Sequence, residues 1–287
     1  MGGVFLPYSQ FVTLLVLSSN RANRWRVGRS VSYFDGTNFG HTYSSNLCNN
    51  ERFKPMKKLL SNGNTNAKTA KNLRESLILY LAPFTQNSKG INLCPKASAG
   101  CISACLFTAG RGVFANVQKA RRERTEYFLH DRHTFIRQIM AEINHKAKRT
   151  QGELAVRLNG TSDVKLVQMC VATGMHIEPN VVFYDYTKIP QKAGTWQLDS
   201  GHRYVVTLSR SETNEADVIK HLQSGGIAAV VFNELPTHWN GFPVIDGDER
   251  DDLMLDAPKG VVLGLKAKGK ARKDASGFVV TKVANQA

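Results

Sequence analysis

The sequence of 287 residues is poor in long apolar runs, in cysteines and, over its first half, in acidic residues. The apolar run Phe11 to Leu17 is much shorter than the roughly 20 residues that a transmembrane helix needs. We therefore expect no membrane span. Five cysteines in a chain of this length are too few for a disulfide scaffold, so a small secreted domain held by disulfides is excluded as well.

The positive charge is concentrated in one half of the chain. Lys and Arg outnumber Asp and Glu by 38 to 23, a net charge of +15. Residues 1–149 hold 23 basic and 7 acidic residues, whereas residues 150–287 hold 15 and 16. Such an excess predicts an anionic partner, either a small molecule or a nucleic acid.

Residues 1–55 have the composition of a basic, irregular arm, rich in Ser, Asn and Gly and without a clear periodicity. The arginines of this stretch follow its apolar run, whereas a secretory signal has its positive charge before the run. We expect an N-terminal arm over residues 1–55, a single domain over residues 56–287, and a cytoplasmic protein.

Short apolar runs alternate with helical patterns from residue 76 onward. Eight runs of three to six residues are mostly continuously apolar, which is typical of strands buried on both faces. They are 77–82, 154–158, 181–184, 204–208, 228–232, 243–245, 261–265 and 278–281. The predicted fold is α/β, a partial or complete (β/α) barrel with parallel strands, and a doubly wound sheet is the alternative.

Helices are predicted between these strands, the longest from about Asn116 to Lys148, with arginines on the faces outside its apolar stripe. Those arginines are Arg121, Arg122, Arg124, Arg132 and Arg137. Shorter helices are expected over 163–173 and 215–223, the second with Asn214 as its N-cap.

Three cysteines, Cys94, Cys101 and Cys105, lie within twelve residues, in the pattern C-x6-C-x3-C after the first predicted strand. Three thiolates in one loop can bind three irons of a [4Fe-4S] cluster and leave the fourth iron open. A structural zinc site usually needs a fourth ligand, for which His130, His133 and Cys48 are the candidates. Three unrelated buried thiols are the remaining interpretation, and Cys170, in an apolar helix, is expected to be a core thiol.

Five of the predicted strands end in polar residues. In a parallel barrel the carboxyl ends of the strands converge on one rim, where active sites are built. We predict catalytic roles for Lys188, Asp163 and Asp185. The candidate cofactor-binding residues are Arg157, Asn159, Tyr184, Ser209, Arg210, Asp246, Asp248 and Lys266.

Two charged segments near the C-terminus have alternative interpretations. The acidic group Asp246, Asp248, Asp251 and Asp252 is either a surface turn or a magnesium site. The basic stretch Lys266 to Lys273 either contacts phosphates or is a solvated loop.

The order and wording of several motifs resemble the bacteriophage gene product 88 family. These motifs are Asn66-Ala-Lys-Thr-Ala-Lys71, the cysteine segment up to Gly112, Arg157-Leu-Asn-Gly-Thr-Ser-Asp163, Phe183-Tyr-Asp-Tyr-Thr-Lys188, Ser209-Arg-Ser-Glu212, Asp246-Gly-Asp248 and Gly264 to Gly269. The resemblance extends over about 56–280. The name of this family implies no particular chemistry, although a phage protein would act in the cytoplasm of the bacterial host.

A weaker resemblance is to radical S-adenosylmethionine enzymes, including phage-borne relatives with enlarged cysteine spacing. This resemblance implies a [4Fe-4S] cluster on Cys94, Cys101 and Cys105, S-adenosylmethionine as cofactor, and a partial barrel. The first hypothesis is therefore a radical-type iron–sulfur enzyme. A basic nucleic-acid-binding protein with a structural metal is the second, and a metal-dependent phosphoryl-transfer enzyme using the acidic group is the third.

Overall fold

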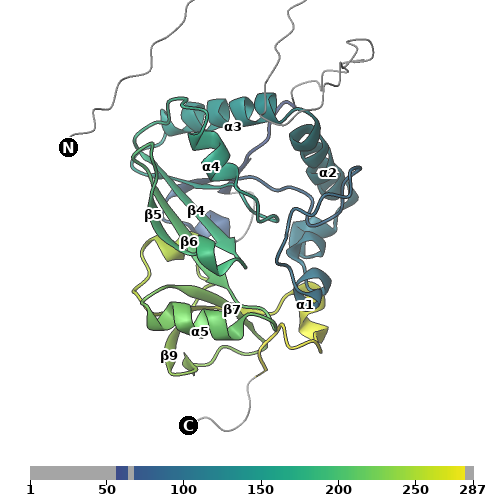
Figure 1. The fold of residues 1–287 in the computed structure, drawn as a ribbon, viewed down its shortest axis with the longest axis vertical. Coiled ribbons are helices and arrows are strands. Elements are labelled where there is room, and N and C mark those ends of the chain that lie inside the picture. The colour runs from purple at the N-terminus through teal and green to yellow at the C-terminus, as the bar shows by residue number, and fades with distance from the viewer. Residues whose placement is uncertain (1–55, 64–67, 282–287) are drawn as a thin grey trace, which may run out of the picture. The chain divides into compact units, whose positions relative to one another are not determined.

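The structure of the protein, a computed structural model, describes residues 56–63 and 68–281 (Figure 1). The predicted arm over residues 1–55 lies outside these ranges, as does Cys48.

Ten strands form one mostly parallel sheet in the described part of the chain. They are β1 (Ser61–Asn62), β2 (Glu75–Ile78), β3 (Leu154–Arg157), β4 (Val181–Thr187), β5 (Gly194–Gln197), β6 (Arg203–Ser209), β7 (Ala228–Phe232), β8 (His238–Trp239), β9 (Phe242–Asp246) and β10 (Val262–Lys266). Their order in the sheet is β1-β2-β3-β4-β6-β7-β10-β9-β8, and β5 adds to β6 in antiparallel orientation. Seven of the eight apolar runs predicted as strands contain or overlap these strands, whereas residues 278–281 form only an isolated bridge, between Val280 and Phe232.

Five α-helices occur in the same residues: α1 (Ala99–Ser103), α2 (Ala115–His130), α3 (Arg132–Ala147), α4 (Leu166–Val171) and α5 (Glu215–Gln223). The predicted helix 116–148 is wrong as one element, because it breaks at Asp131. This residue leaves helical geometry, with φ −136° and ψ 69°, and its side chain caps α3 by accepting a hydrogen bond from the Thr134 amide at 3.1 Å.

Helices α2 to α5 cover one face of the sheet. Apolar residues of α2, α3 and α4 pack against Leu154, Val156, Phe183 and Val206 of the strands. Val218 and Leu222 of α5 pack against strand residues farther along the sheet, whose side chains point to this same face. Figure 1 shows α3 and α4 near β4 and β6, and α5 near β7. This one-sided cover is the layer order of a barrel wall, whereas a doubly wound sheet has helices on both faces.

The sheet is nevertheless open, so the complete barrel is wrong. Among the described residues, β1 pairs only with β2 and β8 only with β9, both antiparallel, and these edges do not meet. The physical reason lies in the connections, because not every crossover contains a helix. A 3₁₀ turn and the antiparallel strand β5 join β4 to β6, and the hairpin β8–β9 follows β7.

Candidate functional site

The three cysteines lie between β2 and α2, against the carboxyl ends of three neighbouring strands. The Cys94 thiol donates to the carbonyl of Thr161, which follows β3, at 3.7 Å. Cys101 is in α1, whose first turn is bound by Glu212 from the end of β6. Cys105 lies two residues after the end of α1. The cysteine loop therefore lies at the edge of the sheet formed by the carboxyl ends of the strands.

Burial keeps the three thiols in their protonated form. It raises the pKa of Cys94 to about 12, an effect that the hydrogen bond from the Phe84 amide opposes and the nearby thiols of Cys105 and Cys101 increase. Burial also raises the pKa of Cys101 and of Cys105, and the Lys188 ammonium opposes both shifts. A metal that binds here would have to displace these protons.

Glu212 fixes the segment that carries Cys101. Its carboxylate accepts hydrogen bonds from the Ser98 hydroxyl at 2.7 Å and from the Gly100 amide at 2.8 Å. Ser98 in turn accepts a hydrogen bond from the Cys101 amide at 3.2 Å. A Cβ at Gly100 would lie 2.6 Å from the Cβ of Phe278, so only glycine fits between these groups. Sequence reasoning did not identify Glu212 as a site residue.

Asp163 and Lys188, both predicted to be catalytic, lie at this edge of the sheet. The Asp163 carboxylate accepts hydrogen bonds from the Thr187 hydroxyl at 2.9 Å and from the Lys192 ammonium at 2.9 Å. Lys188 donates to the Ser209 hydroxyl at 2.9 Å. Burial lowers the pKa of Lys188, and the Cys101 thiol, Asp163 and Glu212 oppose this shift.

A second group of predicted residues lies on the sheet face opposite the helices, and we call it the polar face: Arg157, Tyr184 and Tyr186, with Asp251 and Lys68 packed against them. Asp251 binds Arg157 at 3.1 Å, Lys68 at 3.3 Å and the Tyr184 hydroxyl at 3.0 Å. The Arg157 guanidinium stacks 4.7 Å from the centre of the Tyr186 ring. Burial alone would raise the pKa of Asp251, but Arg157 and Lys68 lower it to about 2.

Asp185 and Asn159 are placed differently from what was predicted. Because side chains alternate along a strand, Asp185 points to the helix-covered face with Phe183, away from Tyr184. Its carboxylate accepts hydrogen bonds from the Asn159 amide at 2.8 Å and from the Tyr204 hydroxyl at 3.1 Å. Burial raises the pKa of Asp185 to about 6. These two residues join β3, β4 and β6 from the side opposite the polar face.

Arg210 binds the C-terminal part of the chain. It forms an ion pair with Glu215 at 2.6 Å, and its guanidinium donates to the carbonyls of Gly277 and Phe278, the latter at 3.0 Å. Its guanidinium is therefore already engaged within the protein.

Asp246, Asp248 and Lys266 form a third group, at the ends of β9 and β10. Asp248 accepts hydrogen bonds from the Lys266 amide at 3.0 Å and from the Lys268 ammonium at 2.7 Å. Asp246 accepts from the Asp248 amide at 2.8 Å. In the rest of the acidic group, Asp252 pairs with Arg250 at 2.7 Å. Three of the four carboxylates are thus bound to cations of the protein.

Arg121 was predicted to lie outside the apolar stripe of its helix, but it is buried, with 7% of its surface exposed. Its guanidinium lies 4.9 Å from the Tyr80 ring centre and 5.5 Å from that of Phe107. Nε and Nη1 have no hydrogen-bond partner among the described residues. Burial lowers the pKa of Arg121, and Tyr80 and the Cys105 thiol oppose this shift.

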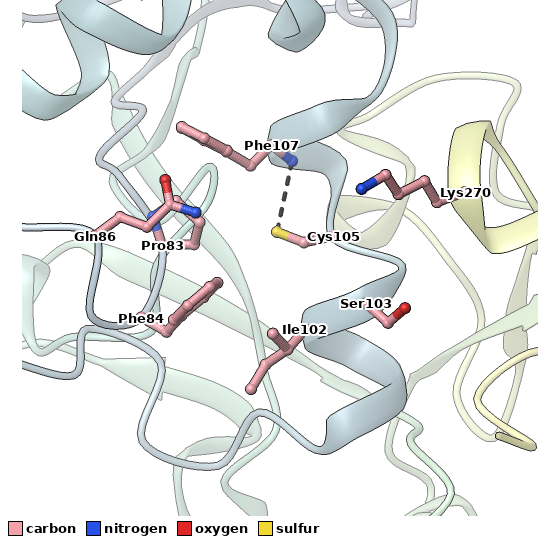
Figure 2. Close-up of a pocket in the computed structure, with 8 residues that line it drawn as sticks. All are labelled: Pro83, Phe84, Gln86, Ile102, Ser103, Cys105, Phe107 and Lys270. Atoms are coloured by element: carbon pink, nitrogen blue, oxygen red, sulfur yellow. Dashed lines mark hydrogen bonds between the residues drawn. The ribbon is translucent and has the colours of Figure 1, made fainter.

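A cavity of about 230 Å³ opens beside Cys105 (Figure 2). Its walls combine apolar side chains, two phenylalanines among them, with polar groups and a lysine. The lining residues are Pro83, Phe84, Gln86, Ile102, Ser103, Cys105, Phe107 and Lys270. Figure 2 shows the Cys105 sulfur near the middle of this group, where it accepts a hydrogen bond from the Phe107 amide at 3.5 Å.

The residues that the structure describes contain no group of three or more His, Cys, Asp or Glu side chains arranged to hold a single metal ion. None of the helices in these residues has the length and apolar character required to cross a bilayer.

Comparison with known proteins identifies the family. No curated protein and no solved structure matches the chain, and the comparisons lend no support to the resemblance to radical S-adenosylmethionine enzymes. The family model described as gene product 88 matches residues 58–282, which is most of the chain. The protein is therefore a member of the gene product 88 family.

Proposed function

We propose that this protein is an iron–sulfur enzyme of the radical S-adenosylmethionine type, active in the reducing cytoplasm of a phage-infected host. Cys94, Cys101 and Cys105 would bind three irons of a [4Fe-4S] cluster. The fourth iron would be available to the cofactor.

The observation that carries this proposal is the set of charges around the three thiols. A buried cation, Arg121, lies next to Cys105, and burial lowers its pKa. Lys188, next to Cys101, already has the carboxylates of Asp163 and Glu212 near it. Arg121 has two nitrogen atoms without a hydrogen-bond partner. A buried cation without a matching anion is unfavourable. Three thiolates bound to a cluster would supply the missing negative charge.

A cluster would bind the three thiols differently from a single ion. A zinc ion needs its ligands to converge at about 2.0–2.3 Å. The cysteines of a cluster each bind a different iron, so their sulfur atoms stand farther apart. A shared neighbourhood, in which the charges of Cys94, Cys101 and Cys105 affect one another, is what such a cluster requires.

When bound, the cluster would supply one electron, received from an external donor, for reductive cleavage of the carbon–sulfur bond of S-adenosylmethionine, which leads to hydrogen abstraction from a substrate. The chain's own residues position the reactants. Lys188 and Arg121 would attract anionic groups beside the cysteines, and Asp163 holds Thr187 and Lys192 in place.

The test is metal and sulfide analysis of the full chain after expression and purification without oxygen. We expect a brown protein with about four irons and four sulfides per chain. The variant Cys101→Ala should lose most of both. Cys170→Ala is the matched control, because Cys170 is a fully buried thiol of α4 in the helix-covered core, and it should keep the wild-type content.

Two results would contradict the proposal. One is a colourless protein that contains one zinc per chain although oxygen was excluded. The other is a cluster whose iron content is the same in Cys101→Ala as in the wild type.

Nucleic-acid binding is a second candidate function, favoured by the exposed arginines of α2 and α3. Arg122, Arg132 and Arg137 all lie on the outer side of these helices. Phosphate contacts are sensitive to salt because binding releases counterions from the nucleic acid. Binding of single-stranded DNA should therefore weaken steeply between about 50 and 200 mM salt. Absence of binding at the lower salt concentration would remove this candidate.

A further inference from the structure

The polar face holds charged groups that the proposed function does not use. Two of its members, Tyr184 and Asp251, are buried. The other three, Arg157, Lys68 and Tyr186, are half-buried, and the two cations keep 13% and 18% of their side-chain surface exposed. Solvent therefore reaches the cations, whereas the carboxylate that binds them is enclosed. A small molecule that approaches this side of the sheet would meet positive charge first.

The Arg157 guanidinium is bound along only one side. Its Nη1 donates to the two carboxylate oxygens of Asp251, at 3.2 and 3.1 Å. Among the described residues, Nε is buried without a hydrogen-bond partner, and Nη2 has none either. Nε and Nη2 together form the edge through which a guanidinium binds a carboxylate with two parallel hydrogen bonds. Because native proteins rarely leave a buried donor unsatisfied, this edge indicates a ligand with acceptor oxygens.

The neighbours of Arg157 hold it in one orientation. The guanidinium lies 4.7 Å from the centre of the Tyr186 ring. Asp251, which binds Nη1, accepts a hydrogen bond from the Tyr184 hydroxyl at 3.0 Å, and its own amide donates to the Asn72 side chain at 2.8 Å. A side chain that is fixed before the ligand arrives loses little conformational entropy on binding. Arg157 is therefore arranged for recognition, unlike an arginine on an open surface.

The charges of the polar face do not balance. Burial alone would lower the pKa of Arg157 and of Lys68, but Asp251 opposes this effect and the pKa of both side chains is raised, so both stay protonated. Two cations therefore face one carboxylate. A further carboxylate that acts on Lys68, that of Asp248, is paired with Lys268 at 2.7 Å. The polar face thus has a surplus of one positive charge.

An aromatic ring borders the same place. Tyr80 follows two residues after Ile78, which pairs with Arg157 in the sheet, so its side chain points to the polar face. The ring rests on the backbone of Gly160, where a Cβ would lie only 2.6 Å from the Tyr80 Cδ1 atom. Its phenol is close enough to Arg157 to raise the pKa of the guanidinium, against the effect of burial. A ring beside a cation suits an organic ligand that has one apolar part and one charged group.

We propose that the polar face binds a small organic molecule through its carboxylate group. The carboxylate lies against the Nε–Nη2 edge of Arg157, with the Lys68 ammonium as the second cation, and the apolar part of the molecule packs beside Tyr80. One carboxylate cancels the surplus charge, whereas a phosphate, with a charge of about −1.5 to −2, would reverse it. None of the three cysteines takes part, so this inference is independent of the proposed function.

The experiment measures the binding of three fluorinated probes to the full chain by fluorine NMR. The probes are para-fluorobenzoate, the neutral para-fluorobenzamide and para-fluorophenyl phosphate, which share a ring and differ in the group that meets Arg157. Arg157→Lys keeps the positive charge but removes the Nε–Nη2 edge, and Lys68→Met removes the surplus charge. Arg137→Lys is the matched control, because Arg137 is an exposed arginine of α3, on the helix-covered side. The melting temperature of every variant is recorded.

We expect para-fluorobenzoate to bind the wild type and Arg137→Lys with the same affinity. The amide should not bind, and the phosphate should bind more weakly than the benzoate. Arg157→Lys and Lys68→Met should each weaken benzoate binding about tenfold or more, because each removes an interaction with a charged group. Lys68→Met changes a side chain that solvent reaches and should keep the wild-type melting temperature, so its loss of binding does not come from unfolding.

Four results would overturn the inference. If the folded wild type does not bind the benzoate, or binds the amide equally well, the polar face does not recognise a carboxylate. If the phosphate binds more tightly than the benzoate, the ligand class is wrong. If Arg137→Lys weakens binding as much as Arg157→Lys, the probe binds on the outer side of the helices. The iron content of the protein enters none of these outcomes, so they leave the iron–sulfur proposal untouched.

Discussion

Two buried aspartates on opposite faces of the sheet show how neighbours decide the chemistry of a residue. Asp185 is 1% exposed and Asp251 is 3% exposed, so their burial is nearly equal. Asp185, on the helix-covered face, accepts hydrogen bonds from the neutral groups of Asn159 and Tyr204, and its pKa rises to about 6. Asp251, on the polar face, contacts Arg157 and Lys68, and its pKa falls to about 2.

The difference teaches that the two faces have different tasks. On the helix-covered face, burial dominates, and the carboxyl group of Asp185 serves as an internal link between strands. On the polar face, Asp251 is one member of a charged group that includes two cations. The first group consists of a carboxyl group and neutral hydrogen-bond donors, whereas the second contains a carboxylate and two cations.

The largest expected effect comes from Asp251→Asn. This change removes the negative charge between Arg157 and Lys68, so that two buried cations lose their anionic partner. The free energy of unfolding should fall by about 3–5 kcal/mol. Urea denaturation at pH 7 measures the change. Asp246→Asn, at an exposed carboxylate, is the control and should change it by less than about 0.5 kcal/mol. A loss at Asp251→Asn as small as that of the control would show that the charges of the polar face are not coupled.

An intermediate effect is expected from the pH dependence of Asp185. Because its folded pKa of about 6 lies above the usual value of 3.8, its contribution to stability is full below pH 3.8 and is lost as the pH rises through 6. The denaturation midpoint of the wild type should therefore differ between about pH 4.5 and pH 6.5, the range over which this contribution is lost. The variant Asp185→Asn should lose that part of the difference.

Asp251 has the opposite sign and serves as the comparison. Its folded pKa of about 2 lies below the usual value of 3.8, so its contribution is present above pH 3.8 and is lost as the pH falls through 2. If Asp185→Asn keeps the wild-type difference in midpoint between about pH 4.5 and pH 6.5, then burial does not control the pKa of this carboxyl group in solution.

The smallest effect is expected from two matched tyrosine variants. Tyr184→Phe removes a hydrogen bond to the ionised Asp251, and Tyr204→Phe removes one to Asp185. Hydrogen bonds to charged groups contribute about 1.5–3 kcal/mol and neutral ones about 0.5–1.5 kcal/mol. At pH 5, below the folded pKa of Asp185, Tyr184→Phe should therefore be the more destabilising variant in urea denaturation. Equal losses would mean that the two carboxyl groups have the same ionisation state.

Much of the fold was predictable from local sequence. The predicted bounds of the strand over 228–232 and of the helix over 215–223 agree with the structure at both ends. The helix has acidic residues in its first turn and Lys220 and His221 in its last, in accord with the helix dipole, and Gly225, with φ +83°, follows it. Asn214 is its N-cap as predicted, although its side chain binds Ser211 and Ser209 rather than the first turn.

The sequence indicated which edge of the sheet carries the candidate residues, but not which of its two faces each side chain occupies. The ends of parallel strands share one edge, which is why Cys94, Asp163, Lys188 and Ser209 meet there. Which face a side chain occupies depends on strand parity, and a single position separates Tyr184 from Asp185. Arg121 did leave a signal, because it stands four and seven residues before the buried Thr125 and Phe128 of α2, on the same helical stripe.

By itself the sequence determined the parallel strands, most of the helices, the family and the clustering of three cysteines, because these follow from short-range periodicity and from motifs. Only the tertiary structure decided that the sheet stays open, that Asp185 and Asp251 have opposite pKa shifts, and that Arg121 lies buried beside Cys105. Each of these depends on contacts between residues far apart in the chain. The physical reason is that burial and Coulomb interactions are set by neighbours in space, which local patterns do not specify.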